Sequence, residues 1–415
     1  MKILIVYITL LLSGLFYAGI VSAKNIYVGK QRAYKTIKAG LQAAVRGDTV
    51  FVDKGIYQES GLEIDKSIYV KGNGYPVIDG QKKGTVITIH ADGAVLDGFK
   101  IINSGNSEQT DYAGVLIVDS YNVIVKNNQL VDNQFSIYSQ HSRNCRILDN
   151  VIHSNAQDEV LSGNGIHCWR SDSLLIIGNN ISGQRDGIYF EFVTNSLVWR
   201  NISHNNLRYG IHFMFSHHDT YISNVFEKNG SGVAVMFTHH VQMYNNFFLD
   251  NWGGAAYGIL LKEITDSYIS GNHFSHNTTA IEMEGCNRTK FFKNSFIDNG
   301  YAMRVSASSM DNEVYENNFI KNTFDVATNG TLVLNKFYRN YWDKYDGYDL
   351  NRDGIGDIPY RPVSLYSTIV ESNPSALMLF RSIIVSLLDK TEKLIPGITP
   401  ENLKDDQPCI KPIKL

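Results

Sequence analysis

The chain has 415 residues, with 38 lysines and arginines against 41 aspartates and glutamates. This near balance of charge argues against a nucleic-acid-binding protein, which needs a basic stripe. The 24 tyrosines, 20 phenylalanines and 34 glycines, with only 8 prolines, combine strand-forming and turn-forming residues and indicate a large all-β protein.

The N-terminus is typical of an export signal. Lys2 precedes an apolar run from Ile3 to about Ile20, and the small residues of "VSA" end just before Lys24. We therefore predict a signal peptide over 1–23 and a mature protein that works outside the cytoplasm, with an uncleaved anchor as the alternative. No later apolar stretch approaches the roughly 18 residues of a membrane-spanning helix.

Residues 24–62 are predicted to cap the N-terminal end of the fold. The segment Thr36–Val52, "TIKAGLQAAVRGDTVFV", reads as a short amphipathic helix, a Gly-Asp turn and a strand. Exposed strand edges template unwanted pairing, so an open-ended repeat fold needs such a cap.

A repeat of about 22 residues organises positions 63–335. A small residue followed by an apolar one recurs at Gly114, Ser136, Gly165, Gly187, Gly210, Gly232, Gly258, Ala280 and Ala302. An asparagine marks the same beat at Asn128, Asn150, Asn180, Asn201, Asn224, Asn246, Asn272, Asn294 and Asn318. This period predicts a right-handed parallel β-helix, in which stacked three-stranded coils bury a continuous core. Asparagines in one column can then exchange amide hydrogen bonds along the stack.

Two segments 22 residues apart repeat an unusual pattern, "MFSHH" from Met214 and "MFTHH" from Met236. The coil register makes the two methionines stacked neighbours that face outward, with His212 and Glu191 beside them. Thioethers select Cu(I), and imidazole also suits copper. The candidate ligands for copper bound in transit, as Cu(I), are Met214, Met236, His212, His217, His218, His239 and His240.

A purely structural interpretation of the same residues stays open. His218 and His240 fall in a column that elsewhere holds turn residues such as Asn195, and a histidine can hydrogen-bond there as asparagine does. The methionines could lie flat on neighbouring phenylalanines. No tight ligand spacing such as H-x-x-x-H is present, so a permanent closed metal site is not expected.

The cysteines do not identify a metal site. Cys145, Cys168, Cys286 and Cys409 form no C-x-x-C pair. One or two disulfides in an oxidising compartment and buried idle thiols are both compatible with these positions.

Residues 336–368 are predicted to form an Asp/Gly-rich loop that closes the solenoid. Asp349, Asn351, Asp353 and Asp357 take positions 1, 3, 5 and 9 of a calcium-type loop, with Gly354 at position 6. Position 12 is a tyrosine, so the usual bidentate glutamate is missing. Calcium binding and a metal-free turn both remain open.

Residues 369–415 are predicted to form a tail with a docking helix. The segment Asn373–Lys390, "NPSALMLFRSIIVSLLDK", begins with Asn-Pro, a good helix start, and is apolar on most sides. It is too short to span a membrane. It could pack over the last coil or bind a membrane partner.

The stretch "YWDKYDGYDLNRDGIGDIPYRP" (Tyr341–Pro362), after an Asn-laddered solenoid and a signal peptide, closely resembles the NosD family. The segment Leu379–Leu403 extends the resemblance. It implies a periplasmic β-helix protein, without enzyme activity or catalytic residues, that serves nitrous oxide reductase maturation. The implied partners are an ABC transporter permease with its ATPase, through which the protein meets the membrane, a copper chaperone lipoprotein and nitrous oxide reductase.

The alternative function is a polysaccharide lyase or uronate epimerase on the same scaffold. These enzymes need a base beside carboxylates or calcium on the outer face. The candidates expected on one face are Arg185, Asp186, Tyr189, Glu191, His167 and Arg208. Their weakness is the lack of a neighbouring carboxylate cluster that could hold calcium.

Overall fold

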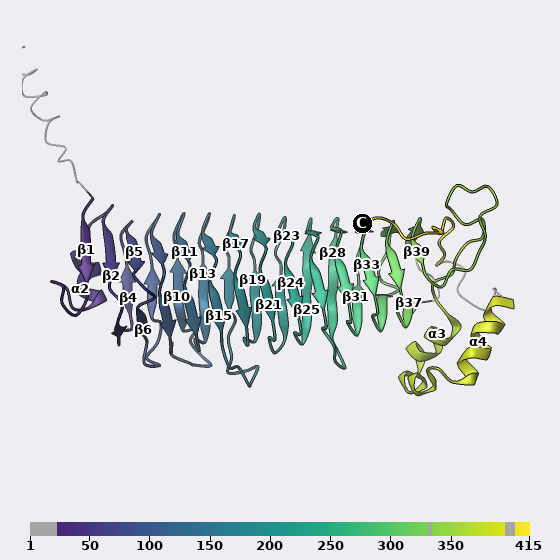
Figure 1. The fold of residues 1–415 in the computed structure, drawn as a ribbon, viewed down its shortest axis with the longest axis horizontal. Coiled ribbons are helices and arrows are strands. Elements are labelled where there is room, and N and C mark those ends of the chain that lie inside the picture. Colours follow the sequence, from purple (N-terminus) through teal and green to yellow (C-terminus); the bar gives the residue numbers. More distant parts are fainter. Residues whose placement is uncertain (1–22, 331–333, 395–402) are drawn as a thin grey trace, which may run out of the picture.

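The computed structural model describes residues 23–330, 334–394 and 403–415 and shows a right-handed parallel β-solenoid, which confirms the predicted fold class (Figure 1). The predicted signal peptide lies outside the described residues except for its last position. Among the described helices, none has the length and apolarity to span a membrane.

The strands of successive coils stack into three parallel sheets, which we name A, B and C. The sheets hold 14, 13 and 12 strands, because the coils at the two ends do not contribute to all three. Sheet A consists of β1 (Asn25–Val28), β2 (Thr49–Val52), β5 (Tyr69–Gly72), β8 (Val95–Asp97), β11 (Ile124–Lys126), β14 (Arg146–Leu148), β17 (Leu175–Ile177), β20 (Leu197–Trp199), β23 (Thr220–Ile222), β26 (Gln242–Tyr244), β29 (Tyr268–Ser270), β32 (Lys290–Phe292), β35 (Glu313–Tyr315) and β38 (Lys336–Tyr338). Sheet B consists of β3 (Ile56–Tyr57), β6 (Val77–Asp79), β9 (Lys100–Ile102), β12 (Gln129–Val131), β15 (Val151–His153), β18 (Asn180–Ser182), β21 (Ile202–His204), β24 (Val225–Glu227), β27 (Phe247–Leu249), β30 (His273–Ser275), β33 (Ser295–Ile297), β36 (Asn318–Ile320) and β39 (Tyr341–Trp342). Sheet C consists of β4 (Leu62–Ile64), β7 (Ile87–Ile89), β10 (Ala113–Val118), β13 (Phe135–Gln140), β16 (Ile166–Trp169), β19 (Asp186–Glu191), β22 (Tyr209–Met214), β25 (Ser231–His239), β28 (Tyr257–Thr265), β31 (Thr279–Glu284), β34 (Tyr301–Val305) and β37 (Phe324–Thr328). The sheets run from Asn25 to Trp342 and therefore extend beyond both expected solenoid boundaries, 63 and 335.

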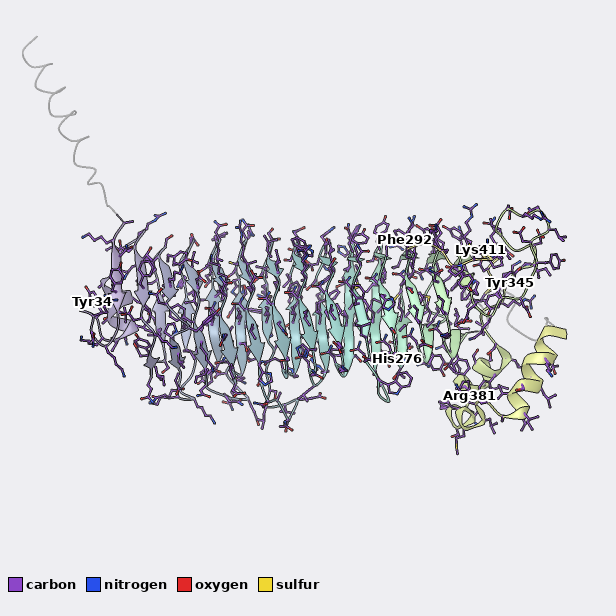
Figure 2. The ribbon with its side chains drawn as sticks, in the orientation of Figure 1. Tyr34, His276, Phe292, Tyr345, Arg381 and Lys411 are labelled. Carbon is purple, nitrogen blue, oxygen red and sulfur yellow. The ribbon has the colours of Figure 1, made fainter. Side chains whose placement is uncertain are left out.

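The core is a stack of apolar side chains inside the three sheets. Fully buried rings such as Phe248, Phe274 and Phe296 stack on one another with centroids 4.7 and 5.0 Å apart. Side chains that alternate with them point outward, where they cover the whole length of the solenoid (Figure 2).

An asparagine ladder runs between sheets A and B, as the sequence predicted. The side-chain amides bond in series through Asn128, Asn150, Asn179, Asn201, Asn224, Asn246, Asn272, Asn294, Asn317 and Asn340. At two coils the sequence assignment was wrong by one residue, because Asn179 and Asn317 point inward where Asn180 and Asn318 had been expected. Both pairs read Asn-Asn, so the spacing alone does not choose between them.

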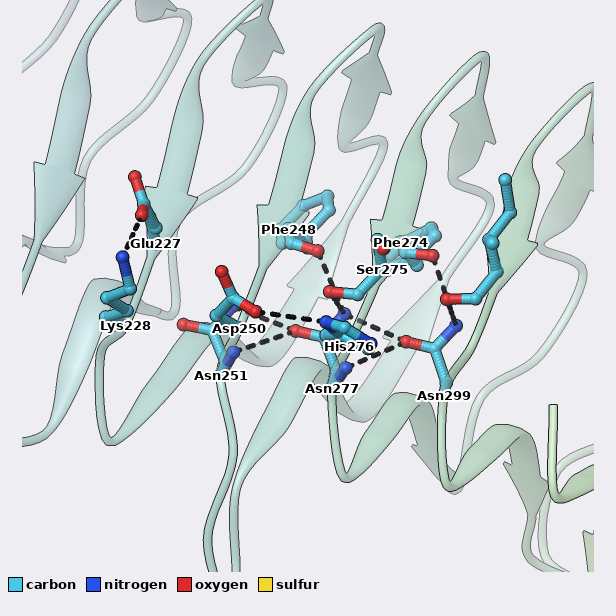
Figure 3. A network of polar contacts seen from close by, with 11 residues as sticks. Glu227, Lys228, Phe248, Asp250, Asn251, Phe274, Ser275, His276, Asn277 and Asn299 are labelled. Atoms are coloured by element: carbon cyan, nitrogen blue, oxygen red, sulfur yellow. Dashed lines mark hydrogen bonds and ion pairs between the residues drawn. The ribbon is translucent and has the colours of Figure 1, made fainter. Parts of the chain in front are cut away.

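The sequence did not predict a second asparagine ladder between sheets B and C. Figure 3 shows Asn251, Asn277 and Asn299, whose amides bond in series at 3.0 Å. Each amide nitrogen also donates to the backbone, for example from Asn277 to the Phe248 carbonyl. Because these turns are buried, the ladders satisfy backbone groups that would otherwise lack partners.

Both ends of the solenoid are capped. At the N-terminal end, α2 (Ile37–Ala43) buries Ile37 and Leu41, and Thr36 accepts a hydrogen bond from the Ala39 amide at its start. At the C-terminal end, Asp405 takes the next ladder position, accepting from the Asn340 backbone and side chain at 2.9 and 3.1 Å. The C-terminus then turns back along the solenoid (Figure 1).

The helical tail lies beside the last strands of sheet C and does not form the cap (Figure 1). It contains α3 (Leu365–Ser372), the 3-10 helix η1 (Pro374–Leu379) and α4 (Ile383–Leu394). The expected single helix over Asn373–Lys390 is therefore divided, because Arg381 adopts a left-handed backbone with φ 64°.

Candidate functional site

The two methionines of the repeated pattern are neighbours on the outer face of sheet C. Met214 on β22 is the register partner of Met236 on β25, and both are half-buried. Their column continues to Glu191 on one side and Lys262 on the other. The structure thus confirms that the methionines are adjacent, although it leaves them only partly exposed to solvent.

Tyr189 contacts the methionine pair from the preceding coil. Its hydroxyl donates to the Met214 Sδ at 3.9 Å, and its ring packs on the His212 imidazole. Burial raises the pKa of Tyr189 to about 12, so this hydroxyl stays protonated at physiological pH.

A ridge of stacked phenylalanines follows the methionines along the chain. Phe192, Phe215 and Phe237 stack with ring centroids 5.3 and 5.1 Å apart. All three adopt left-handed backbone conformations, with φ between 50° and 55°. The chain turns at this ridge, and the histidines lie beyond it.

The histidine cluster is formed by two neighbouring coils. The His217 and His239 rings are stacked at 3.9 Å, and His218 and His240 are stacked at 4.8 Å. His239 Nδ1 and His240 Nδ1 lie 2.8 Å apart. Within the part of the chain that the structure describes, His218, His239 and His240 are the one group of three potential ligands whose donor atoms all lie within 4.8 Å of one another.

Burial and crowding lower the pKa of two of these imidazoles, His217 and His239. Burial, then the neighbouring His239, His218 and His240, lower the pKa of His217. Burial and two neighbouring histidines likewise lower the pKa of His239. Neutral imidazoles keep a lone pair, which is what a metal ion needs.

His212 lies apart from the other histidines. It is 7% exposed, and burial lowers its pKa to about 4. The Arg208 Nη2 donates to His212 Nδ1 at 3.3 Å, which leaves the proton of the neutral ring on Nε2. Within the described residues that buried Nε2 has no hydrogen-bond partner. The one free lone pair of the neutral ring, on Nδ1, is taken by Arg208 and is therefore not presented to an incoming ion.

The residues considered for a lyase or epimerase do come together on this face, but as a closed network. Arg208 holds the fully buried Asp186 through two hydrogen bonds of 3.0 and 2.6 Å, and Arg185 lies 3.6 Å from the same carboxylate. Burial lowers the pKa of His167 to about 3. Together with the raised pKa of Tyr189, this places neither base near neutrality. Glu191 stays outside the network, beside Met214.

The Asp/Gly-rich loop is held by its own backbone. Asp349 accepts from the amides of Asp353 and Gly354, and Asp357 accepts from the Leu350 amide. Asn351 also bonds to Asp353. The described carboxylates of the loop form no group of three potential ligands with donor atoms close together, and calcium binding there stays a prediction.

All four cysteines lie in described residues and are free thiols. Burial raises the pKa of Cys145 to about 11 and that of Cys286 to about 12. Thiols held in this form do not offer thiolate ligands, so the interpretation as buried idle thiols holds for them in this structure.

A cavity of about 540 Å³ separates the methionine column from the helical tail. Its lining includes Lys262, which follows Met236 in the column. Arg304 also lines the cavity. Its guanidinium donates hydrogen bonds to Glu371 of α3 at 2.9 and 3.1 Å and to Glu282 at 3.2 Å. Burial raises the pKa of Glu282 to about 7 despite this guanidinium. The ion pairs join the tail to sheet C.

Sequence comparisons show which proteins this chain is similar to. The family model described as periplasmic copper-binding protein (NosD) matches residues 153–347, and the model for the right-handed beta helix region matches residues 53–176. A protein of Pseudomonas aeruginosa named probable ABC transporter binding protein NosD is 26% identical over 84% of this chain and 85% of its own length. The protein of the same name from Stutzerimonas stutzeri is 27% identical over 81% of this chain and 80% of its own.

Solved structures share the fold. The family 28 exopolygalacturonase of Yersinia enterocolitica superposes with a TM-score of 0.58, covering 78% of this chain and 79% of its own, at 8% identity. Identity this low shows the scaffold alone, because β-helices carry unrelated functions. By the family model and the two relatives, the resemblance seen in the sequence is confirmed, and this chain is a relative of the NosD proteins on a right-handed β-helix.

Proposed function

We propose that this protein is a periplasmic accessory protein that carries copper as cargo beside an ABC transporter, in the maturation of nitrous oxide reductase. The observation that carries the proposal is the in-register pair Met214 and Met236 on the outer face, in a chain related to NosD proteins. In this role the β-helix is a rigid platform, and it has no catalytic residues.

The methionine pair has the chemistry of a transfer site for Cu(I). Two thioethers from adjacent strands supply soft ligands, which select Cu(I) over harder ions. A pair of neutral sulfur ligands leaves room for a donor or an acceptor protein to add its own ligand. Copper can then pass by ligand exchange, with no change of oxidation state.

Tyr189 and His212 support this pair without binding the ion. The Tyr189 hydroxyl donates a hydrogen bond to the Met214 sulfur. The Arg208 guanidinium donates one to His212 and so orients that ring, which packs against Tyr189. We therefore assign His212 a positioning role, in place of the ligand role considered from the sequence.

The tail has the properties of a transporter-docking element. Met378, Ile383, Ile384 and Leu387 on η1 and α4 are 90%, 81%, 55% and 57% exposed, which is unusual for a cluster of large apolar side chains. The Arg304–Glu371 ion pairs and the packing of Tyr366 against Phe324 couple this surface to sheet C. A motion of the permease and its ATPase would reach the solenoid through these contacts.

The copper proposal is tested by anaerobic Cu(I) titration of the purified mature chain against a chromogenic Cu(I) chelator. The wild-type chain should withdraw copper from the chelator, and the Met214→Leu/Met236→Leu double variant should lose that ability. Met310→Leu is the matched control, because this methionine is 41% exposed and lies outside the pair. Equal copper uptake by the double variant and the wild type would overturn the assignment.

The docking proposal is tested by copurification with the detergent-solubilised transporter. Ile383→Ser with Leu387→Ser should reduce recovery of the complex. Ile56→Ser, at the opposite end and 70% exposed, should not. Undiminished recovery of the tail variant would remove the docking role.

A further inference from the structure

The four clustered histidines are not explained by the thioether site. His218 and His240 occupy the left-handed turn position that holds Asn122, Asn144, Ser173, Asn195 and Asp266 in other coils. Among residues other than glycine, asparagine, aspartate and histidine are all enriched in this backbone, and asparagine and aspartate also hydrogen-bond the local turn. Turn geometry therefore does not require a histidine at this position in two successive coils. It also does not explain why another histidine, His217 or His239, directly precedes it in each coil.

The cluster and the methionine pair occupy different positions along the same two coils. Met214 ends β22 and Met236 lies on β25, both on the outer face of sheet C. In each coil a left-handed phenylalanine, Phe215 or Phe237, follows the methionine, and the histidines come after it, with His239 at the end of β25. We treat the histidines as a ligand group of their own because the donor atoms of three of them lie within 4.8 Å of one another.

We infer that His218, His239 and His240 form a second metal site, separate from Met214 and Met236, which binds a divalent ion of borderline softness, Cu(II) in preference to Zn(II). Three imidazoles, with donor atoms within 4.8 Å of one another, form a ligand set that suits both ions. Copper ranks above zinc because divalent copper binds nitrogen ligands most tightly in its series. The inference goes beyond Cu(I) transfer, since it concerns the oxidised ion.

The metal-free arrangement already brings the donor atoms together. With His239 Nδ1 and His240 Nδ1 2.8 Å apart, one ring must donate its N–H to the other. When an ion takes both lone pairs, the donating ring becomes its Nε2–H tautomer, so the neutral imidazoles need lose no net proton. His217 supports the site, because its ring stacks on His239 and its Nδ1 accepts from the His239 amide at 3.3 Å.

The coordination shell is left open. The nearest acidic neighbour in the turn column, Asp266, is held by Arg288 through hydrogen bonds of 2.7 and 2.8 Å. A set of three protein ligands, which is what the described part of the chain offers here, resembles sites that exchange a ligand rather than closed structural sites. An ion here remains open to a fourth ligand from water or from a partner.

The test is a Cu(II) titration of the metal-free mature chain, followed by electron paramagnetic resonance and repeated with Zn(II) by calorimetry. The wild-type chain should bind one Cu(II) with nitrogen hyperfine structure, and Zn(II) at the same site more weakly. His239→Gln/His240→Gln should weaken Cu(II) binding by more than about 100-fold, because losing even an outer-shell partner costs about 10–100-fold.

Two controls keep the outcomes distinct. His153→Gln/His276→Gln removes two exposed histidines outside the cluster and should leave Cu(II) binding unchanged. Met214→Leu/Met236→Leu should lose Cu(I) but keep Cu(II), which would separate this site from the proposed copper-transfer site. The inference is overturned if the cluster variant binds Cu(II) as the wild type does. Loss of Cu(II) in the methionine variant would also overturn it, because the two clusters would then be one site.

Discussion

The asparagine ladder should carry a large share of local stability at each coil, and Asn224→Ala tests this. The Asn224 side chain is fully buried. Its Oδ1 accepts from the Asn201 amide at 2.9 Å and from the Asn201 Nδ2 at 3.0 Å. Its Nδ2 donates to the Val198 carbonyl and to the Asn246 side chain.

Removing this side chain leaves the buried backbone N–H of Asn201 without its acceptor and the Val198 carbonyl without that donor, whereas the Asn201 Nδ2 keeps the Ile176 and Trp199 carbonyls. Each buried donor or acceptor that loses its partner costs about 1–3 kcal/mol, so we expect a loss of about 3 kcal/mol in the free energy of unfolding. Backbone strain adds nothing, because the left-handed residue of this turn is Ser223 and not Asn224.

The assay is guanidinium unfolding followed by far-UV circular dichroism. The control is Asn180→Ala, which removes an exposed asparagine whose one side-chain hydrogen bond is to His204. An exposed change of this kind should cost under about 0.5 kcal/mol. If both variants lose the same small amount, the ladder does not carry the stability that we assign to it.

Three further predictions concern ionisable groups. Because burial lowers the pKa of His167 from 6.5 to about 3, its contribution to stability is present above pH 6.5 and is lost as the pH falls towards 3. Unfolding curves should show up to about 5 kcal/mol of acid sensitivity that His167→Phe removes; an unchanged pH slope would contradict this. The effect of Glu282 on stability has the opposite pH dependence. Its pKa rises from 4.5 to about 7, so its contribution to stability is present below pH 4.5 and is lost as the pH rises through 7. The free energy of unfolding of Glu282→Gln should therefore rise relative to that of the wild type by at most about 3 kcal/mol between pH 4.5 and 7. A difference that does not change with pH would argue against this. Glu371→Gln should make the opening of α3 easier by about 2 kcal/mol, seen as faster hydrogen exchange in Leu365–Ser372 with no change in β1; equal protection would show that Arg304 does not hold the tail.

Much of the fold follows from the period of the sequence. The 22-residue step fixes which residues share a column, so it predicted the neighbours Met214 and Met236 and the turn positions of His218 and His240, which the structure shows to be left-handed. It could not choose between Asn179 and Asn180, since neighbouring asparagines differ only in the direction of their side chains. It also could not show that Asp405, far along the chain, completes the ladder, because that contact depends on the path of the tail.

The candidate site was less predictable, because its chemistry depends on side-chain directions and burial. The alternation of strand residues placed His212 on the outer face, but it did not show that Arg208 and the tyrosines bury the ring. Nor did it show the phenylalanine ridge that separates methionines from histidines, although Phe215 and Phe237 stand within the repeated pattern. A search for residues between the candidate ligands would have found that ridge.

The proposed copper delivery to nitrous oxide reductase is best tested by measuring the copper in that enzyme. We would purify the reductase from the native host under denitrifying conditions, with the gene intact, deleted, or encoding the Met214→Leu/Met236→Leu variant. We expect a reductase that keeps its electron-transfer copper but lacks the copper–sulfur centre in both altered strains. A fully loaded reductase from the deletion strain would contradict the proposal.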